Sequence, residues 1–123
     1  MTPRPAQRLP YRRAFSTLGC PDADLDEVIR LAGEVPAGAC TGVELRCAAG
    51  QLAYPRMPAT EADALAARLG AAGLHLVCLA SYVQVAAADG ERDTPQEDLA
   101  AHLRLAAGLG APAVRVFGGG ADR

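Results

Sequence analysis

Leu69-Gly-Ala-Ala-Gly-Leu-His-Leu76 is the stretch that decides the fold, because it recurs as Leu109-Gly-Ala-Pro-Ala-Val-Arg-Val116. Each copy ends an amphipathic segment at glycine and then begins an apolar run. A helix that ends at glycine and is followed at once by a strand is typical of repeated βα units. The two copies lie about 40 residues apart, a spacing that favours a repeated unit over a chance alternation.

Outward from these joints, apolar strands and amphipathic helices alternate along the chain. The expected strands are 15–20, 42–47, 74–83 and 113–118, and the expected helices are 24–34, 60–72 and 94–109. Alternation of this kind predicts an α/β protein built of parallel (β/α) units. Four strands and three helices are about half of a TIM barrel, which needs roughly 250 residues. We therefore expect a partial barrel domain over residues 15–123, after an irregular N-terminal lead-in over residues 1–14 that is rich in proline and arginine.

Each expected helix has a start signal and an apolar stripe. Asp24, Thr60 and Thr94 stand where capping side chains are preferred. The expected stripes are Leu25, Val28, Ile29 and Ala32 in the first helix, Ala62, Leu65, Ala66 and Leu69 in the second, and Leu99, Leu103, Ala106 and Leu109 in the third. These stripes predict three helices that pack one side on the sheet.

Composition limits the classes of function. Half of the 123 residues are hydrophobic, 21% are charged and the net charge is −2, which indicates a globular chain without the basic footprint of a nucleic-acid-binding protein. No apolar run approaches the ~20 residues of a membrane span, and no apolar segment typical of a secretory signal follows the arginine-rich start. The four cysteines form no C-x-x-C pair, so we expect free thiols in a cytoplasmic protein, with no membrane or nucleic-acid partner.

The carboxyl ends of the expected strands are where a parallel barrel binds its ligands. Glu44 and Arg46 share one face of the second strand, and Arg115 and Phe117 share one face of the fourth. Because the side chains of one barrel layer come from alternate strands, Glu44 and Arg115 are expected to meet inside the barrel. Two interpretations stay open for this pair, namely a polar floor that orients a substrate and a buried structural ion pair.

Further donors lie nearer the mouth of the expected barrel. Arg46 ends the second strand, and Ser81 and Tyr82 end the third. A role at an ordinary strand end is the alternative for Ser81 and Tyr82. The predicted substrate-binding residues are Glu44, Arg46, Ser81 and Arg115. Neither His75 nor His102 is placed to activate a nucleophile, so no catalytic residue is predicted.

Metal and phosphate motifs are weak in this chain. At the strand ends stand Glu44, Cys20 and Cys47, with Asp22 in the first loop, which is not the convergent set that a metal site needs. We therefore predict no cofactor held by this chain alone. The run Gly118-Gly119-Gly120 is similar to a phosphate-cradling loop, but no helix N-terminus follows it to complete an anion site.

Three segments, each at an expected strand, carry a family resemblance. They are Phe15-Ser-Thr-Leu-Gly-Cys-Pro21, Gly42-Val-Glu-Leu-Arg46 and Leu109-Gly-Ala-Pro-Ala-Val-Arg-Val-Phe-Gly118. Together they resemble the N-terminal half of the sugar phosphate isomerase/epimerase family, the xylose isomerase-like TIM barrel group. The resemblance implies an isomerase or epimerase of carbohydrate metabolism that acts on a sugar, polyol or related keto compound, with a divalent metal in a complete member.

The resemblance also implies where the chemistry lies. In that family the metal ligands come mostly from strands five to eight, so the half seen here is expected to be inactive alone. Its partners would be a sugar-like substrate and either a second copy or a C-terminal half-barrel. The alternative is a non-catalytic α/β binding module that holds a small anion near residues 118–120.

Overall fold

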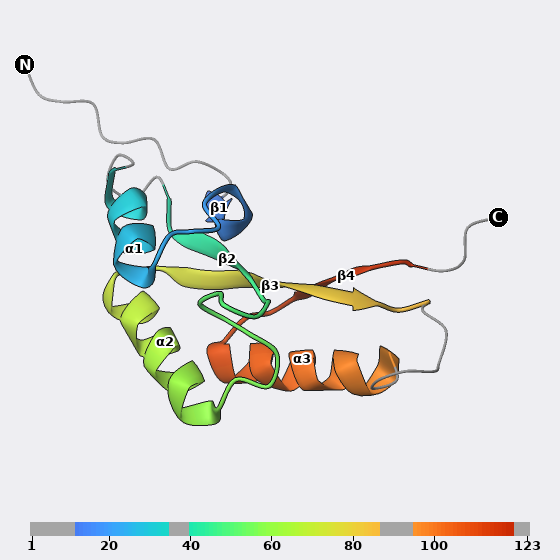
Figure 1. Cartoon of the computed structure of the whole chain (residues 1–123). Coiled ribbons are helices and arrows are strands. Elements are labelled where there is room, and N and C mark those ends of the chain that lie inside the picture. The colour runs from blue at the N-terminus through green and yellow to red at the C-terminus, as the bar shows by residue number, and fades with distance from the viewer. Residues whose placement is uncertain (1–11, 35–39, 87–94, 120–123) are drawn as a thin grey trace, which may run out of the picture.

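A parallel four-stranded sheet organises the structure, a computed structural model that describes residues 12–34, 40–86 and 95–119 (Figure 1). The elements are β1 (Ala14–Ser16), the 3-10 helix η1 (Thr17–Gly19), α1 (Leu25–Glu34), β2 (Gly42–Arg46), α2 (Ala59–Ala71), β3 (His75–Gln84), α3 (Pro95–Leu109) and β4 (Val114–Phe117). Every neighbouring pair of strands is parallel, in the order β1-β2-β3-β4. The predicted α/β class, with parallel (β/α) units about half as many as a TIM barrel needs, is confirmed.

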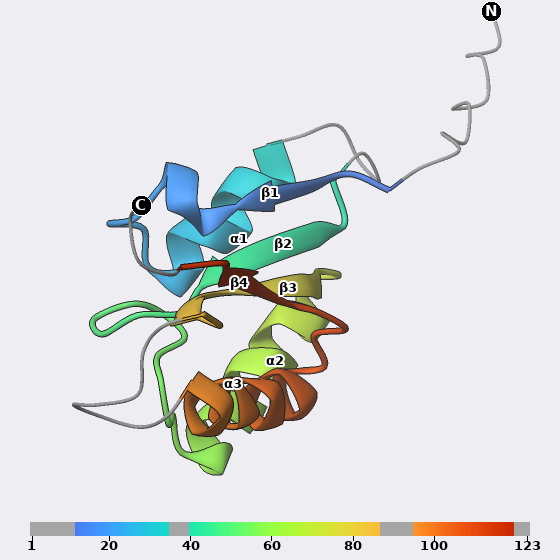
Figure 2. The ribbon, with the colours of Figure 1, turned by 90° about the vertical axis from the view of Figure 1, so that its right-hand side faces the viewer.

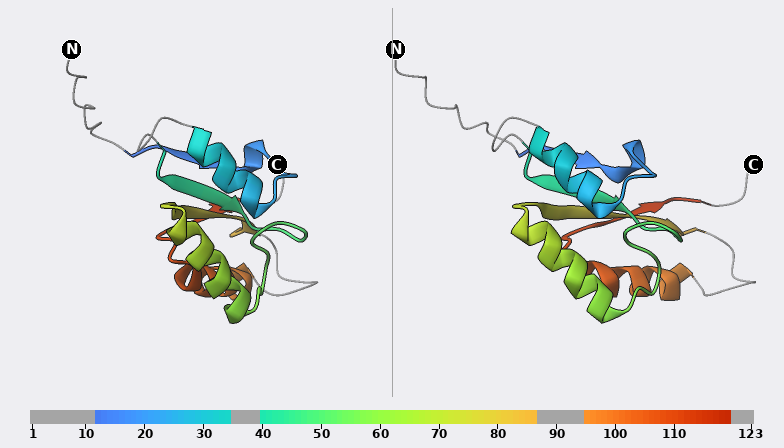
Figure 3. Two further views of the ribbon diagram at one scale, coloured as in Figure 1. Left: turned by 90° about the vertical axis from the view of Figure 1, so that its left-hand side faces the viewer. Right: turned by 60° about the vertical axis from the view of Figure 1, so that its left-hand side comes forward.

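The helices all lie on one side of this sheet. When consecutive strands are neighbours and crossovers keep one hand, each connecting helix returns over the same face. Figures 2 and 3 show α1, α2 and α3 along that side, which we call the covered face. Among the described residues no α-helix lies on the other side, which we call the open face. In a closed barrel the covered face points outward to the helices and the open face points to the barrel interior.

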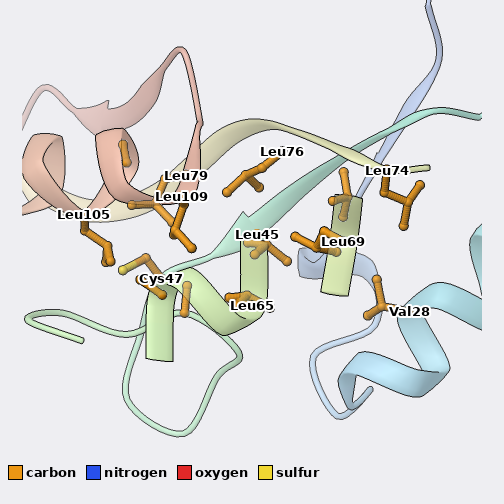
Figure 4. Packing of buried hydrophobic residues seen from close by; sticks show 14 residues of the cluster. Val28, Leu45, Cys47, Leu65, Leu69, Leu74, Leu76, Leu79, Leu105 and Leu109 are labelled. Atoms are coloured by element: carbon orange, nitrogen blue, oxygen red, sulfur yellow. The ribbon is translucent and has the colours of Figure 1, made fainter. Parts of the chain in front are cut away.

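The hydrophobic core fills the covered face. Val43 and Leu45 of β2 and Leu79 of β3 are fully buried there. Side chains from all three helices pack in the same cluster, among them Val28, Leu65, Leu69, Leu105 and Leu109 (Figure 4). The stripes predicted for the first two helices are therefore confirmed as the surfaces that meet the core, with Ala62, Leu65 and Leu69 buried in α2. No helix among the described residues is long and apolar enough to span a membrane.

The first expected strand is shorter than predicted, because Ser16 turns the chain. Its hydroxyl accepts a hydrogen bond from the Leu18 amide at 3.2 Å and begins η1, so the strand does not reach Cys20. The Thr17 hydroxyl then accepts from the Arg46 amide at 2.9 Å. The 3-10 turn is thus fixed against the end of β2, next to the site described below.

Two helix details differ from the sequence prediction, and one is confirmed. Asp24 accepts a hydrogen bond from the Glu27 amide at 2.9 Å, as expected of a cap. In contrast, α2 begins at Ala59 after Pro58, with no side-chain cap, so the prediction of a Thr60 cap is wrong. Thr94 lies outside the described residues.

The buried side of α3 is rotated from the predicted stripe. Leu103 is 51% exposed, whereas His102 is only 4% exposed. The buried residues of α3 are His102, Leu105, Ala106 and Leu109, which fall on one side of a helix. The His102 ring reaches its own helix backbone, with Nδ1 at 2.8 Å from the Asp98 carbonyl oxygen. This local partner lets a polar ring take an inward position that its residue type did not indicate.

Candidate binding site on the open face

The open face is built from residues that alternate with the core residues of the same strands. Successive side chains of a strand point to opposite faces, so burial of Val43 and Leu45 sends Glu44 and Arg46 to the open side. The side chains that interact there are Ser16 of β1, Glu44 and Arg46 of β2, Cys78 and Tyr82 of β3, and Arg115 and Phe117 of β4. Arg46, Tyr82 and Phe117 stand at or near the carboxyl ends of their strands, the end at which parallel barrels bind ligands.

One group on this face is centred on the Glu44 carboxylate. The Ser16 hydroxyl donates to Glu44 Oε1 at 2.7 Å. Cys78 is level with Glu44 in the β2–β3 register. Burial raises the pKa of the Cys78 thiol, and the nearby Glu44 carboxylate raises it further. The thiol is therefore held in its protonated form, which is not the form that acts as a nucleophile.

A second group joins Arg46 to Tyr82. Arg46 Nε donates to the Tyr82 hydroxyl oxygen at 2.8 Å, and its Cζ lies 5.4 Å from the centre of the Tyr82 ring. This contact fixes one edge of the guanidinium against β3. Among the described residues, no acceptor binds the two terminal nitrogens of Arg46, which remain able to donate.

Arg115 approaches the same ring from β4. Its Cζ lies 5.4 Å from the Tyr82 ring centre and 4.5 Å from that of Phe117. The two rings stack with their centres 6.0 Å apart. Arg115 Nη2 donates to the Ser81 carbonyl oxygen at 2.7 Å, while its Nε is buried without an acceptor among the described residues. We call Arg46, Tyr82, Arg115 and Phe117 the arginine–aromatic cluster.

The expected contact between Glu44 and Arg115 is not formed. No ion pair joins them in the part of the chain that the structure describes. The register explains this, because Ala80 pairs with Arg46 on one side and with Arg115 on the other. Arg115 is therefore level with Arg46, one layer beyond Glu44. The structure brings three of the four predicted residues to the open face, but it groups the two arginines rather than the opposite charges.

Ser81, the fourth predicted residue, points elsewhere. It is fully buried, and its hydroxyl donates to the Arg115 carbonyl oxygen at 2.5 Å and accepts from the Val83 amide at 3.3 Å. The first of these bonds joins β3 to β4 where their register shifts, between Ala80 and Gln84, and the second lies within β3. The Ser81 hydroxyl therefore holds the β4 backbone at Arg115, and the Ser81 carbonyl oxygen accepts from the Arg115 side chain.

Tyr82 and Phe117 are the members of the cluster that were missing from the predicted binding set. Both are large apolar side chains that stay exposed, at 47% and 43%. Their positions in the sequence could have indicated a binding role. Each is an aromatic residue at the end of an expected strand, close to a predicted binding residue. What the sequence did not indicate is that the two rings would stack on each other, with both arginines against the Tyr82 ring.

Another hollow of the surface lies away from the open face. A groove of about 610 Å³ lies between α2 and α3, on the covered side, and Ala62, Asp63, Ala101 and Arg104 are among its lining residues. It contains no residue from a strand end. Among the described residues, no three His, Cys, Asp or Glu side chains converge as a metal site would require. The open face, in contrast, brings together polar side chains from all four strands.

Comparisons of the chain with protein-family models, curated proteins and solved structures found no match. The evidence for function therefore comes from the geometry of the open face. Two guanidinium groups with free donors, one carboxylate held by serine and two stacked rings form a surface that can bind and orient a polar ligand. It includes no histidine and no activated thiol to transfer a proton or attack a substrate.

Proposed function

We propose that this chain forms the N-terminal half of a barrel enzyme of the sugar phosphate isomerase/epimerase type. The substrate would be a sugar, a polyol or a related keto compound. The observation that supports the proposal is the arginine–aromatic cluster, which lies at the carboxyl end of a parallel sheet with all described helices on its other face. Enzymes of barrel architecture bind their substrates at that end.

In this proposal the described half binds and orients the substrate. Arg46 and Arg115 would donate hydrogen bonds to substrate oxygens, and the Tyr82 and Phe117 rings would pack against its carbon skeleton. A complete enzyme of this type uses a divalent metal to assist proton transfer. The described residues do not fit such a centre, because the Glu44 carboxylate is bonded to Ser16 and no cluster of ligands surrounds it. The metal ligands would come from a complementary half.

The edges of the sheet suggest how that half would attach. β1 and β4 are the outer strands of the described sheet, and the exposed apolar residues Val77 and Phe117 lie on the open face. A two-fold axis along the barrel axis would place β4 of one copy parallel to β1 of another at both seams. Eight parallel strands would result. Further β/α units of a C-terminal half-barrel would complete the barrel in the same way, in a cytoplasmic protein.

The proposal is tested by titrating the isotope-labelled chain with glucose and with glucose 6-phosphate while recording amide and arginine side-chain NMR signals. We expect millimolar binding that shifts the signals of Arg46, Tyr82 and Arg115. The same samples with Mg²⁺ or Mn²⁺ should show no isomerisation. Shifts confined to the groove between α2 and α3, or turnover by the chain alone, would contradict the half-barrel proposal.

A second candidate is a small α/β module that binds an anion near residues 118–120. Gly119 supports it, because its φ of +68° and a Cβ position 2.8 Å from Gln84 Cβ both require glycine. Gly120 lies outside the described residues. Light scattering after size exclusion separates the two candidates. A folded monomer favours the module, whereas a dimer, or an aggregate that dissolves with an added C-terminal half, favours the barrel.

A further inference from the structure

We infer that the arginine–aromatic cluster is a site for an oxyanion, the phosphate ester or carboxylate of the substrate, with Arg46 and Arg115 as its two anchors. The inference deepens the proposed function and rests on it, because it assigns a charge to the substrate. It starts from the contacts of the two guanidinium groups, both of which lie 5.4 Å from the centre of the Tyr82 ring.

The charge balance of the open face leaves these arginines without counter-charges. The ion pairs of the described residues join other side chains, and none includes Arg46 or Arg115. Glu44, one layer before the two arginines, accepts from Ser16 instead. Two like charges on one small surface repel each other, the more so where rings exclude water. A bound oxyanion would remove that repulsion.

The donors point to an anion rather than to a neutral hydroxyl. Arg46 uses Nε for the Tyr82 hydroxyl and keeps its two terminal nitrogens, the fork that binds carboxylate or phosphate oxygens in pairs. Arg115 uses Nη2 for the Ser81 carbonyl, and its buried Nε has no acceptor among the described residues. A donor closed to solvent is out of reach of an incoming oxygen, so the group that Arg115 offers to a ligand is Nη1, for which the described residues provide no acceptor.

The rings hold the two anchors in place. Tyr82 stacks on Phe117, and both arginines lie against the Tyr82 ring. A guanidinium held against aromatic rings by cation–π contact loses less conformational freedom when it binds. The cluster is therefore preorganised, which improves affinity without adding contacts.

The test is an NMR titration at constant ionic strength with inorganic phosphate, glucose 6-phosphate, gluconate and glucose. The variants are Arg46→Gln and Arg115→Gln, and the matched control is Arg104→Gln, on the α3 side of the sheet. We expect each cluster variant to bind glucose 6-phosphate about tenfold more weakly, the usual scale for losing a hydrogen bond to a charged group. The control should bind glucose 6-phosphate as tightly as the native chain, and the cluster variants should weaken glucose 6-phosphate more than they weaken glucose. The gluconate and phosphate arms show which oxyanion is preferred.

Each outcome separates this inference from the proposed function. If glucose binds at the cluster as tightly as its phosphate, and the variants weaken both equally, the barrel proposal stands and the anion site is wrong. If phosphate binds through both arginines but no sugar does, the anion site stands and the substrate proposal is wrong. Binding by neither overturns both. If Arg115→Gln fails to fold by circular dichroism, Arg46→Gln decides, because its side chain makes no buried hydrogen bond in the described structure.

Discussion

The covered and open faces of this sheet come from the same strands but differ in burial and in polarity. On the covered face Val43, Leu45 and Leu79 are fully enclosed by helices. On the open face, Glu44 and Arg46 alternate with these residues and keep partial contact with solvent. The first face lowers the free energy of the fold through apolar burial, whereas the second places charges and rings where a ligand can reach them. Because side chains alternate along a strand, neighbouring residues serve different roles, one in the stability of the core and the next in the candidate binding surface.

Leu45→Ala should have the largest effect on stability, because it leaves a cavity in the core, where Leu45 is fully buried. We expect the free energy of unfolding to fall by about 2–5 kcal/mol in urea denaturation. The matched change on the open face is Val77→Ala, where the side chain is 37% exposed and the loss should stay below about 1 kcal/mol. Equal losses from the two variants would mean that the open face is also buried, for instance in a stable dimer.

Gly42→Ala tests a close approach between the backbone of β2 and side chains of the two neighbouring strands. A Cβ at Gly42 would lie 2.8 Å from Val77 Cγ1 and 2.9 Å from Ala14 Cβ, so neighbouring strands must move. We expect a loss of about 1–3 kcal/mol, the usual cost of overpacking. Gly70→Ala is the control, since nothing lies within 4 Å of that position in α2. It should gain about 0.5–1 kcal/mol through helix propensity. The same sign at both positions would contradict this account.

The architecture could be predicted from the sequence because it depends on local and repeated signals. The glycine joint after Leu69 and its copy after Leu109 mark where helices end and strands begin, and both lie in the structure as predicted. The predicted element boundaries and buried faces were wrong where a side chain forms a hydrogen bond with the backbone. Ser16 turned the chain into η1, and His102 turned inward because the Asp98 carbonyl was within reach. Such partners are set by three-dimensional contact, which periodicity does not encode.

The Cys47 thiol on the covered face should make the stability of the fold depend on pH. Burial on the covered side, with the charge of Asp98, raises its thiol pKa from 9.0 to about 11. The folded protein then holds this proton more tightly than the unfolded chain. Stability from this group is therefore complete below about pH 8 and falls as the pH rises toward 11. We expect a loss on the order of 1 kcal/mol between pH 8 and pH 10.

The measurement is urea denaturation across that pH range for the native chain and for Cys47→Ala. The variant should be less stable at pH 7, since it loses buried volume, but its stability should decline less steeply with pH. The variant carries every other titratable group of the native chain, so the difference between the two pH profiles isolates Cys47. Parallel declines in the two proteins would show that Cys47 does not titrate differently in the folded state.

The binding site was harder to predict than the fold, because it depends on register. Alternation alone placed Glu44, Arg46 and Arg115 on one face, and the structure has them there. The expected pair of Glu44 with Arg115 required knowing which layer each strand contributes. A bulge between Val43 and Glu44 and a second shift after Ala80 set that layer. Neither irregularity has a signal in the strand pattern.

Tyr82→Phe should have the smallest effect, and it separates the two roles of this ring. The change removes the hydroxyl that accepts from Arg46 Nε but keeps the ring against Arg115 and Phe117. Because the side chain is 47% exposed, water replaces the lost bond and stability should change by less than about 1 kcal/mol. Tyr82→Ala removes the ring as well and should release both arginines. If the cluster is held by stacking, arginine side-chain NMR signals will broaden in Tyr82→Ala and stay sharp in Tyr82→Phe. Equal broadening would assign the order of the site to the single hydrogen bond instead.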